Sequence, residues 1–324
     1  MTITVFLLFI LGLIFISYGA NALVASTENI SKKYNISYFL SSFIFIGLAT
    51  SSPEIFISII SSLDGKSNLA IGNALGSNVA NIAFVFAISY LFLNKDILHT
   101  NKIIDRETYG FILILVIITM IVFLILKDGM VSINDALLLI SAFFILVFLY
   151  KKFFYQKLND HNNLNLTDEK NGSVIIINLI IGLLTLLIGT ELLLNSSITV
   201  AKYYGVSDYV IGLSITAVGS SIPELASSIE SARKKNLDFI IGNILGSNIF
   251  NFAIVISLAG LFSSELPKSL HITDLLRDMT MILITMVSFY IIIKNRNYLF
   301  SKILCTLLLG LFTMYQISLY GVDL

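Results

Sequence analysis

Charged side chains are scarce in this sequence. Lys, Arg, Asp and Glu make up 12% of the 324 residues, about half of what an ordinary soluble domain carries, while hydrophobic residues make up 56%. The 20 basic and 20 acidic side chains cancel, which removes the electrostatic basis for binding nucleic acid. The composition therefore predicts a membrane protein and argues against a soluble enzyme.

Side chains that bind transition metals or act as bases are also few. The one cysteine, Cys305, lies in an apolar run, so the chain forms neither an intrachain disulfide nor a cysteine-based metal site. The three histidines, His99, His161 and His271, all lie in polar connectors. An intramembrane hydrolase would therefore lack a histidine base beside its serine nucleophile. We expect no enzymatic activity and no cofactor.

Long apolar runs occupy most of the chain. A helix that rises about 1.5 Å per residue crosses about 30 Å of hydrocarbon in about 20 residues. Ten runs meet this length, near residues 3–24, 37–62, 68–93, 108–126, 130–150, 173–194, 207–231, 238–262, 276–293 and 303–320. The first has no basic residue before it and no small-residue cleavage site after it, so we expect it to be retained. The chain is predicted to be an all-α, multi-pass protein of the cell membrane, surrounded by the lipid bilayer.

The distribution of basic residues predicts the orientation. The odd-numbered connectors hold 15 of the 20 Lys and Arg side chains. Basic residues accumulate on the cytoplasmic side of membrane proteins. Both termini are therefore predicted to be extracellular, and the longest connector is predicted to be cytoplasmic.

The two halves of the chain resemble each other when Glu54 is aligned with Glu224. In this alignment the stretches 47–62 and 71–81 match 217–232 and 241–251 without a gap, and 14 of the 35 positions from 47 to 81 are identical. Because five spans, an odd number, separate equivalent positions, the second half must enter the membrane from the opposite side. We therefore expect two inverted five-helix repeats, residues 1–150 and 173–324, joined by a cytoplasmic linker, 151–172.

Each repeat places a carboxylate deep in an apolar helix. Glu54 and Glu224 occupy equivalent positions, and an uncompensated charge there costs several kcal/mol. A single buried Glu could be a structural hydrogen-bonding residue, but two at equivalent positions favour a functional role. Each follows a proline, Pro53 or Pro223, which cannot donate to the carbonyl four residues earlier. We expect these carbonyls to be free to face a cation.

Other oxygen donors cluster around these prolines and on the span that follows each of them. They are Thr50, Ser51, Ser77, Asn81, Ser220, Ser221, Ser247 and Asn251. Such hard donors suit Na⁺, Ca²⁺ or Mg²⁺, and two carboxylates balance the charge of Ca²⁺ in an adaptable site. Calcium is the better fit, with Na⁺ competing for the same oxygens.

Further features that recur in both repeats have a second explanation. The GxxxG pairs Gly72/Gly76 and Gly242/Gly246 are expected to allow close helix packing. The asparagines at 73, 78, 243 and 248 fit interhelical hydrogen bonds as well as ligation, and we leave them out of the predicted site.

The motifs resemble those of a known family, the sodium/calcium exchangers of the cation/calcium antiporter superfamily, and are closest to its compact prokaryotic members. The runs Thr50-Ser51-Ser52-Pro53-Glu54 and Ser220-Ser221-Ile222-Pro223-Glu224 are similar to its G-T-S-x-P-E signatures. The stretches 72–81 and 242–251 are similar to its G-N-x-x-G-S-N motifs. Ala49 and Ser220 depart from the signatures, and neither departure removes a ligand.

The resemblance implies a secondary antiporter that takes three Na⁺ inward for one Ca²⁺ outward by alternating access, as the first and sixth spans slide across the site. It implies Ca²⁺ between Glu54 and Glu224, flanking Na⁺ positions, and contributions from the backbone carbonyls of Gly47 and Ala217. Potassium-dependent relatives typically carry Asp where this chain has Asn251, which implies potassium independence. A proton-coupled Ca²⁺ or other cation antiporter and a passive cation channel remain the alternatives. The sequence does not indicate the oligomeric state.

Overall fold

A computed structural model describes residues 3–93, 106–153, 171–205, 217–263, 272–295 and 297–320, and every regular element in these ranges is helical. Eight helices are long and apolar enough to cross a membrane, and one bent pair makes a ninth candidate. The three histidines and most of the predicted linker lie outside the described residues. The chain is therefore a multi-pass helical membrane protein, while the count of ten spans stays a prediction.

The order of the elements follows the predicted spans. In the first half they are α1 Ile3–Tyr34, α2 Tyr38–Ser41, η1 Ser42–Gly47, α3 Leu48–Thr50, α4 Ser52–Leu63, α5 Ser67–Ala80, η2 Asn81–Phe86, α6 Ala87–Leu91, α8 Arg106–Ile125, η3 Leu126–Asp128 and α9 Ile133–Phe153. In the second they are α10 Gly172–Tyr203, α12 Ala217–Gly219, α13 Ile222–Arg233, α14 Leu237–Phe250, η5 Asn251–Val255, α15 Ile256–Leu261, α16 Ile272–Lys294 and α17 Tyr298–Tyr320. The span expected at 207–231 begins outside the described residues and is represented by α12 and α13.

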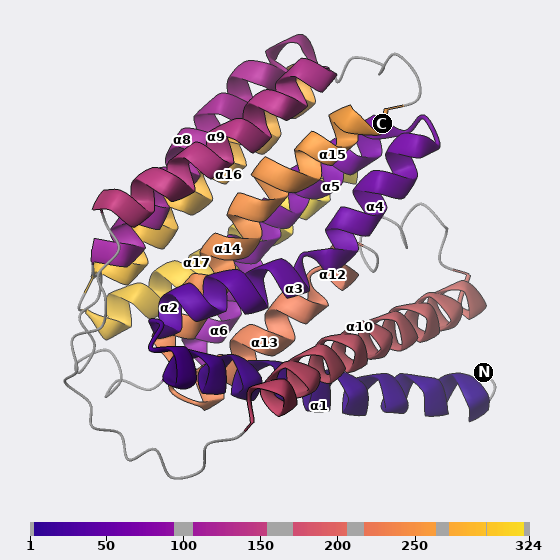
Figure 1. Cartoon of the computed structure of the whole chain (residues 1–324). Helices are drawn as coiled ribbons and strands as arrows, with labels where there is room; N and C mark the ends of the chain where they lie inside the picture. The colour runs from indigo at the N-terminus through magenta and orange to yellow at the C-terminus, as the bar shows by residue number, and fades with distance from the viewer. Residues whose placement is uncertain are drawn as a thin grey trace.

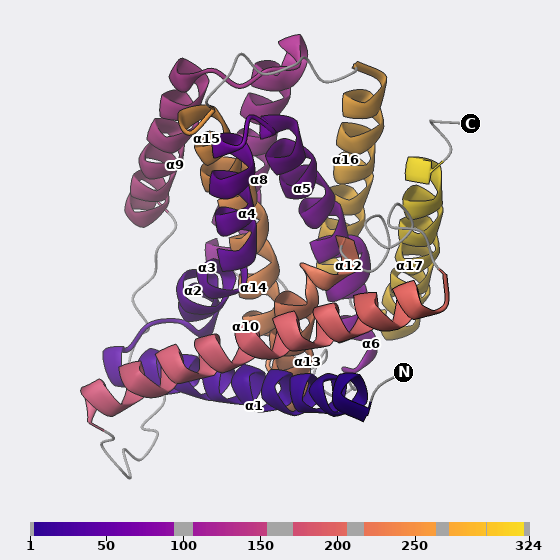
Figure 2. The same cartoon turned by 90° about the vertical axis from the view of Figure 1, so that its right-hand side faces the viewer.

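Helices α1 and α10 lie side by side and antiparallel along one side of the bundle (Figures 1 and 2). Each has 32 residues, longer than the spans expected at 3–24 and 173–194, because no Gly or Pro interrupts their polar ends. Asn35, with a φ of 51°, ends α1, and Gly205, with a φ of 77°, follows α10. The prediction erred by taking the end of the apolar run as the end of the helix.

Glycines bring α1 and α10 into main-chain contact. A Cβ built on Gly12 would lie 2.9 Å from the Gly189 carbonyl oxygen, and one on Gly19 would lie 2.7 Å from that of Gly182. The repeat alignment matches the same four residues, Gly12 with Gly182 and Gly19 with Gly189. Small residues permit such close approach between helices in a membrane.

The second predicted span is not continuous. Helix α3 ends at Thr50, α4 begins at Ser52, and the two parts of the span are bent by 41°. Pro53 therefore lies in the first turn of a new helix, where a missing N–H costs little, and not in the middle of a kinked one. In the second half, α12 and α13 are separated by Ser220 and Ser221 in the same way.

Element boundaries coincide when the two halves are aligned as in the sequence repeat. Helix α4, 52–63, falls on α13, 222–233, and α5, 67–80, falls on α14, 237–250. The π-helical segments η2 and η5 begin at equivalent asparagines, Asn81 and Asn251. Positive φ angles also recur, at Gly65 and Lys235. The repeat therefore extends to backbone conformation, and the inversion of the halves stays a prediction.

Helix α14 lies at the centre of the protein, and all but one of its residues are buried. The π-helical segment η1 and helix α2 pack on it closely, because a Cβ on Gly246 would lie 2.8 Å from the carbonyl oxygen of Phe43 in η1 and one on Gly242 would lie 2.5 Å from that of Phe39 in α2. This confirms a packing role for the second GxxxG pair. Gly72 and Gly76 have no described atom within 4 Å of such a Cβ.

Candidate cation-binding site

Both predicted carboxylates lie at the start of a helix, directly after a break in the chain. Glu54 is in the first turn of α4 and Glu224 in the first turn of α13. A helix N-terminus stabilises negative charge, which partly offsets the cost of burial. Each side chain is 0% exposed. The breaks at Ser51 and Ser221 therefore deliver two carboxylates to the interior of the bundle.

The two carboxylates have few hydrogen-bond donors. The Ser77 hydroxyl donates to Glu54 Oε1 at 3.3 Å, and Glu54 Oε2 has no partner among the described residues. Thr50 approaches the Glu224 carboxylate, but no described side chain donates to it with hydrogen-bond geometry. The carboxylates also interact electrostatically with each other. Two buried like charges with so few donors require a cation or protons between them.

A second cluster of oxygens joins the two halves of the chain beside the carboxylates. The Thr50 hydroxyl lies 3.3 Å from the Ser247 hydroxyl, 3.3 Å from Asn243 Oδ1 and 3.5 Å from the Gly47 carbonyl oxygen. Ser247 also donates to the Gly47 carbonyl at 3.3 Å. This carbonyl, expected to be available to a cation, is therefore occupied by hydroxyls, which a cation would have to displace.

The other predicted ligands are placed as follows. Ser51 and Ser221 are buried at the breaks, and their hydroxyls have no partner among the described residues. Asn81 and Asn251 begin η2 and η5, one helical turn after Ser77 and Ser247. Ser220 lies between α12 and α13, and Ala217, whose carbonyl was the predicted ligand, begins α12. π-Helical segments are frequent at functional sites, and two of the three that the structure describes, η2 and η5, begin at predicted ligands.

The structure adds Asn243, which is outside the predicted site. Its Nδ2 donates to Ser228 Oγ at 2.8 Å, to Ser227 Oγ at 3.2 Å and to the Glu224 carbonyl oxygen at 3.3 Å. With Oδ1 it accepts from Thr50, so it links α3, α13 and α14. Its identity with Asn73 across the repeat was the available signal, although an interhelical role explained that identity equally well.

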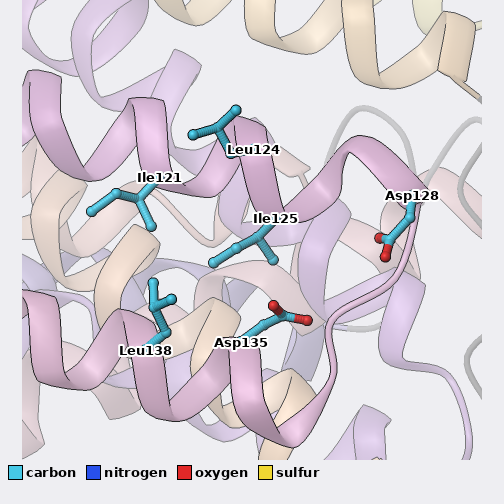
Figure 3. Close-up of a pocket in the computed structure, with 6 residues that line it drawn as sticks. All are labelled: Ile121, Leu124, Ile125, Asp128, Asp135 and Leu138. Carbon is cyan, nitrogen blue, oxygen red and sulfur yellow. The ribbon is translucent and has the colours of Figure 1, made fainter.

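The negative charge of the candidate site comes from Glu54 and Glu224. Within the described ranges, no three His, Cys, Asp or Glu side chains come together. A cavity of about 340 Å³ lies elsewhere, between α8 and α9, and is lined by Asp128 and Asp135 (Figure 3). Both of these carboxylates accept backbone N–H groups of the α8–α9 turn, from Met130 at 3.1 Å and Ser132 at 2.9 Å. Their position indicates a role in the turn.

Comparison with known proteins identifies relatives over most of the chain. The family model described as sodium/calcium exchanger protein matches residues 4–151 and 174–320. The inner membrane protein YrbG of Escherichia coli (strain K12) is 27% identical over 97% of this chain and 96% of its own length. Sodium/calcium exchanger MaX1 of Methanosarcina acetivorans is 29% identical over 79% of this chain and 83% of its own. Among solved structures, the sodium-calcium exchanger NCX_Mj soaked with zero Na⁺ and Ca²⁺ is similar with a TM-score of 0.78 and 27% identity, covering 98% of this chain and 100% of that one.

Proposed function

This chain belongs to the sodium/calcium exchanger family, whose members transport Na⁺ and Ca²⁺ without a cofactor, and we propose that it exchanges three Na⁺ inward for one Ca²⁺ outward. Membership makes it a membrane antiporter and not an enzyme. The proposal concerns the coupling of Ca²⁺ transport to Na⁺, the ratio of three Na⁺ to one Ca²⁺ and the direction of exchange.

The pair Glu54 and Glu224 carries this proposal. Both carboxylates are fully buried and interact with each other, and the described residues offer them only one hydrogen bond. Ca²⁺ neutralises two carboxylates and accepts irregular oxygen coordination at about 2.3–2.6 Å. Na⁺ takes the same class of oxygen ligand, so the two ions compete, and this competition couples their movements.

The proposed ligand set divides between the two ions. Glu54 and Glu224 hold Ca²⁺, and the amide oxygens of Asn81 and Asn251 complete its surroundings. The flanking Na⁺ positions use the hydroxyls of Thr50, Ser51, Ser77, Ser220, Ser221 and Ser247. The carbonyls of Gly47 and Ala217 join when an ion displaces the hydroxyls that now bond to Gly47.

The proposed topology has ten spans in two inverted five-helix repeats, with both termini extracellular and residues 151–172 in the cytoplasm. The coincidence of α4 with α13 and of α5 with α14 when the halves are aligned supports it. The antiparallel pair α1 and α10 also supports it, since the sixth span crosses the membrane in the opposite direction to the first in the proposed topology.

Reconstituted protein tests the coupling. Proteoliposomes loaded with Na⁺ should take up radioactive Ca²⁺ only when the outside medium lacks Na⁺, and equal Na⁺ on both sides should abolish net uptake. Uptake that follows an imposed pH gradient in the complete absence of Na⁺ would instead identify a proton-coupled antiporter. Uptake that ignores both gradients and follows only the membrane potential would identify a channel.

A further inference from the structure

Two pairs of equivalent asparagines lie where α5 and η2 of the first half contact α14 and η5 of the second half. Asn78 and Asn248 lie in α5 and α14, and Asn81 and Asn251 begin η2 and η5. All four side chains are at most 1% exposed. Helix α14 contacts η2, and α5 contacts η5, so each member of one pair faces the other half of the chain. We call these four residues the amide quartet.

The amide quartet is hydrogen-bonded on one side only. Asn81 Nδ2 donates to Asn248 Oδ1 at 3.0 Å, and Asn248 Nδ2 donates to the Asn78 carbonyl oxygen at 3.4 Å. The equivalent bond in the other half would run from Asn251 Nδ2 to Asn78 Oδ1. Instead, the side-chain amides of Asn78 and Asn251 have no partner among the described residues. The same four residues therefore make one bond between side-chain amides and leave its counterpart in the other half unmade.

Other parts of the site are asymmetric in the same sense. The Ser77 hydroxyl donates to Glu54, whereas the equivalent Ser247 donates to the Gly47 carbonyl and leaves Glu224 without that bond. The single amide bond is thus one feature of a conformation in which the two halves differ, although their motifs are identical.

Because all four residues are asparagines, their side-chain chemistry does not favour the Asn81–Asn248 bond over the Asn251–Asn78 bond. Breaking the bond from Asn81 to Asn248 and forming the bond from Asn251 to Asn78 exchanges one buried amide bond for another of the same kind. Such an exchange leaves two states close in free energy, which a carrier needs in order to populate both. Building on the proposed antiport, we propose that the Asn81–Asn248 bond and the Asn251–Asn78 bond are alternatives, one breaking as the other forms, and that this switch accompanies the change of the side from which ions enter.

The switch also positions the ligands. The bond through Nδ2 fixes the Asn81 amide and leaves its Oδ1 without a hydrogen bond among the described residues, so this oxygen can face a cation. Asn251 has no bond that would orient its amide in the same way among those residues. In the alternative arrangement Asn251 becomes the oriented ligand and Asn81 is released. Asn78 and Asn248 are therefore positioning residues.

Leucine substitutions test the switch, because leucine has nearly the shape of asparagine and neither donates nor accepts. The conformation of this structure is packed at Phe39 to Gly47, the half of the site that the proposed topology places toward the cytoplasm. Asn248→Leu removes the bond of this state and should lower the Ca²⁺ KM at the cytoplasmic face relative to the outer face by about fivefold. Asn78→Leu should move the same ratio by about fivefold in the opposite direction, and the double variant should return it toward the wild-type value.

The ratio is measured in oriented proteoliposomes with Ca²⁺ applied to either face. Shifts of the two single variants in the same direction, or no shift in either, would overturn the switch. Absence of Na⁺-dependent Ca²⁺ flux in the wild-type protein would instead refute the proposed function.

A second measurement does not depend on transport or on reconstitution of the leucine variants. In ion-free detergent solution, amide hydrogen exchange of residues 42–47 should be faster in Asn248→Ala and slower in Asn78→Ala than in the wild type. Faster exchange in both variants, or no difference in either, would contradict the switch.

Discussion

The hydroxyl of Thr50, in the first half of the chain, lies 3.3 Å from the hydroxyl of Ser247, in the second half. Each belongs to a motif that recurs in the other half. The two residues are not equivalent, however, because Thr50 aligns with Ser220 and Ser247 aligns with Ser77. The candidate site is therefore formed between the halves, and neither half alone contains it. A substitution of a site residue in either half should therefore impair the binding of both Na⁺ and Ca²⁺.

Neutralising either central carboxylate should abolish exchange. Glu54→Gln and Glu224→Gln each remove one of the two formal charges that face the cation, and at low dielectric this loss is large. We expect Na⁺-dependent Ca²⁺ flux to fall to background, while the amount of folded protein recovered stays near normal, because glutamine preserves the shape. Near-normal flux in either variant, measured in proteoliposomes, would refute the central role of that residue.

The packing of η1 on α14 predicts a difference between equivalent glycines. Gly246→Ala places a Cβ 2.8 Å from the Phe43 carbonyl oxygen and should destabilise the protein by about 1–3 kcal/mol. The matched control is Gly76→Ala, whose Cβ meets no described atom within 4 Å and which should be neutral or slightly stabilising, because alanine favours helix. Thermal unfolding midpoints in detergent compare the two. Equal effects would show that the close contact does not limit stability.

The first GxxxG pair shows what the sequence could and could not predict. Repeat identity, the positions of Glu54 and Glu224 and the membrane-spanning segments follow from composition and spacing, and the structure has helices at these places. The sequence cannot predict which atoms lie beside Gly246, because the motif is the same in both halves and the contact depends on how η1 packs on α14. The sequence also cannot show that a new helix begins at Ser52, since a proline is compatible with both a kink and the start of a helix.

Potassium should not be required for exchange. Asn251 contributes an uncharged amide where the potassium-dependent relatives typically carry a carboxylate, so the described part of the site has no third charge to attract another monovalent cation. We expect equal Ca²⁺ uptake with choline in place of K⁺ in both compartments. A strict K⁺ requirement would show that the residue at this position does not determine potassium dependence.

Exchange should carry net charge across the membrane. Two carboxylates neutralise one Ca²⁺ but leave three Na⁺ with an excess positive charge, so the two loaded states differ in charge. An inside-negative potential should therefore accelerate Na⁺ entry coupled to Ca²⁺ exit and slow the reverse. Valinomycin and K⁺ gradients impose the potential in proteoliposomes. A flux that does not change with potential would indicate two Na⁺ per Ca²⁺ or a compensating proton.

The glycine contacts between α1 and α10 restrict how these helices can move. At Gly12, Gly19, Gly182 and Gly189 the two main chains touch, so no rotatable side chain lies between them to absorb a relative displacement. Sliding one helix along the other would move Gly12 and Gly19 away from the main chain of Leu193 and Leu186 and place residues with side chains against it. The pair should therefore move as a single rigid body, so that a displacement of α1, in one half of the protein, also displaces α10, in the other half.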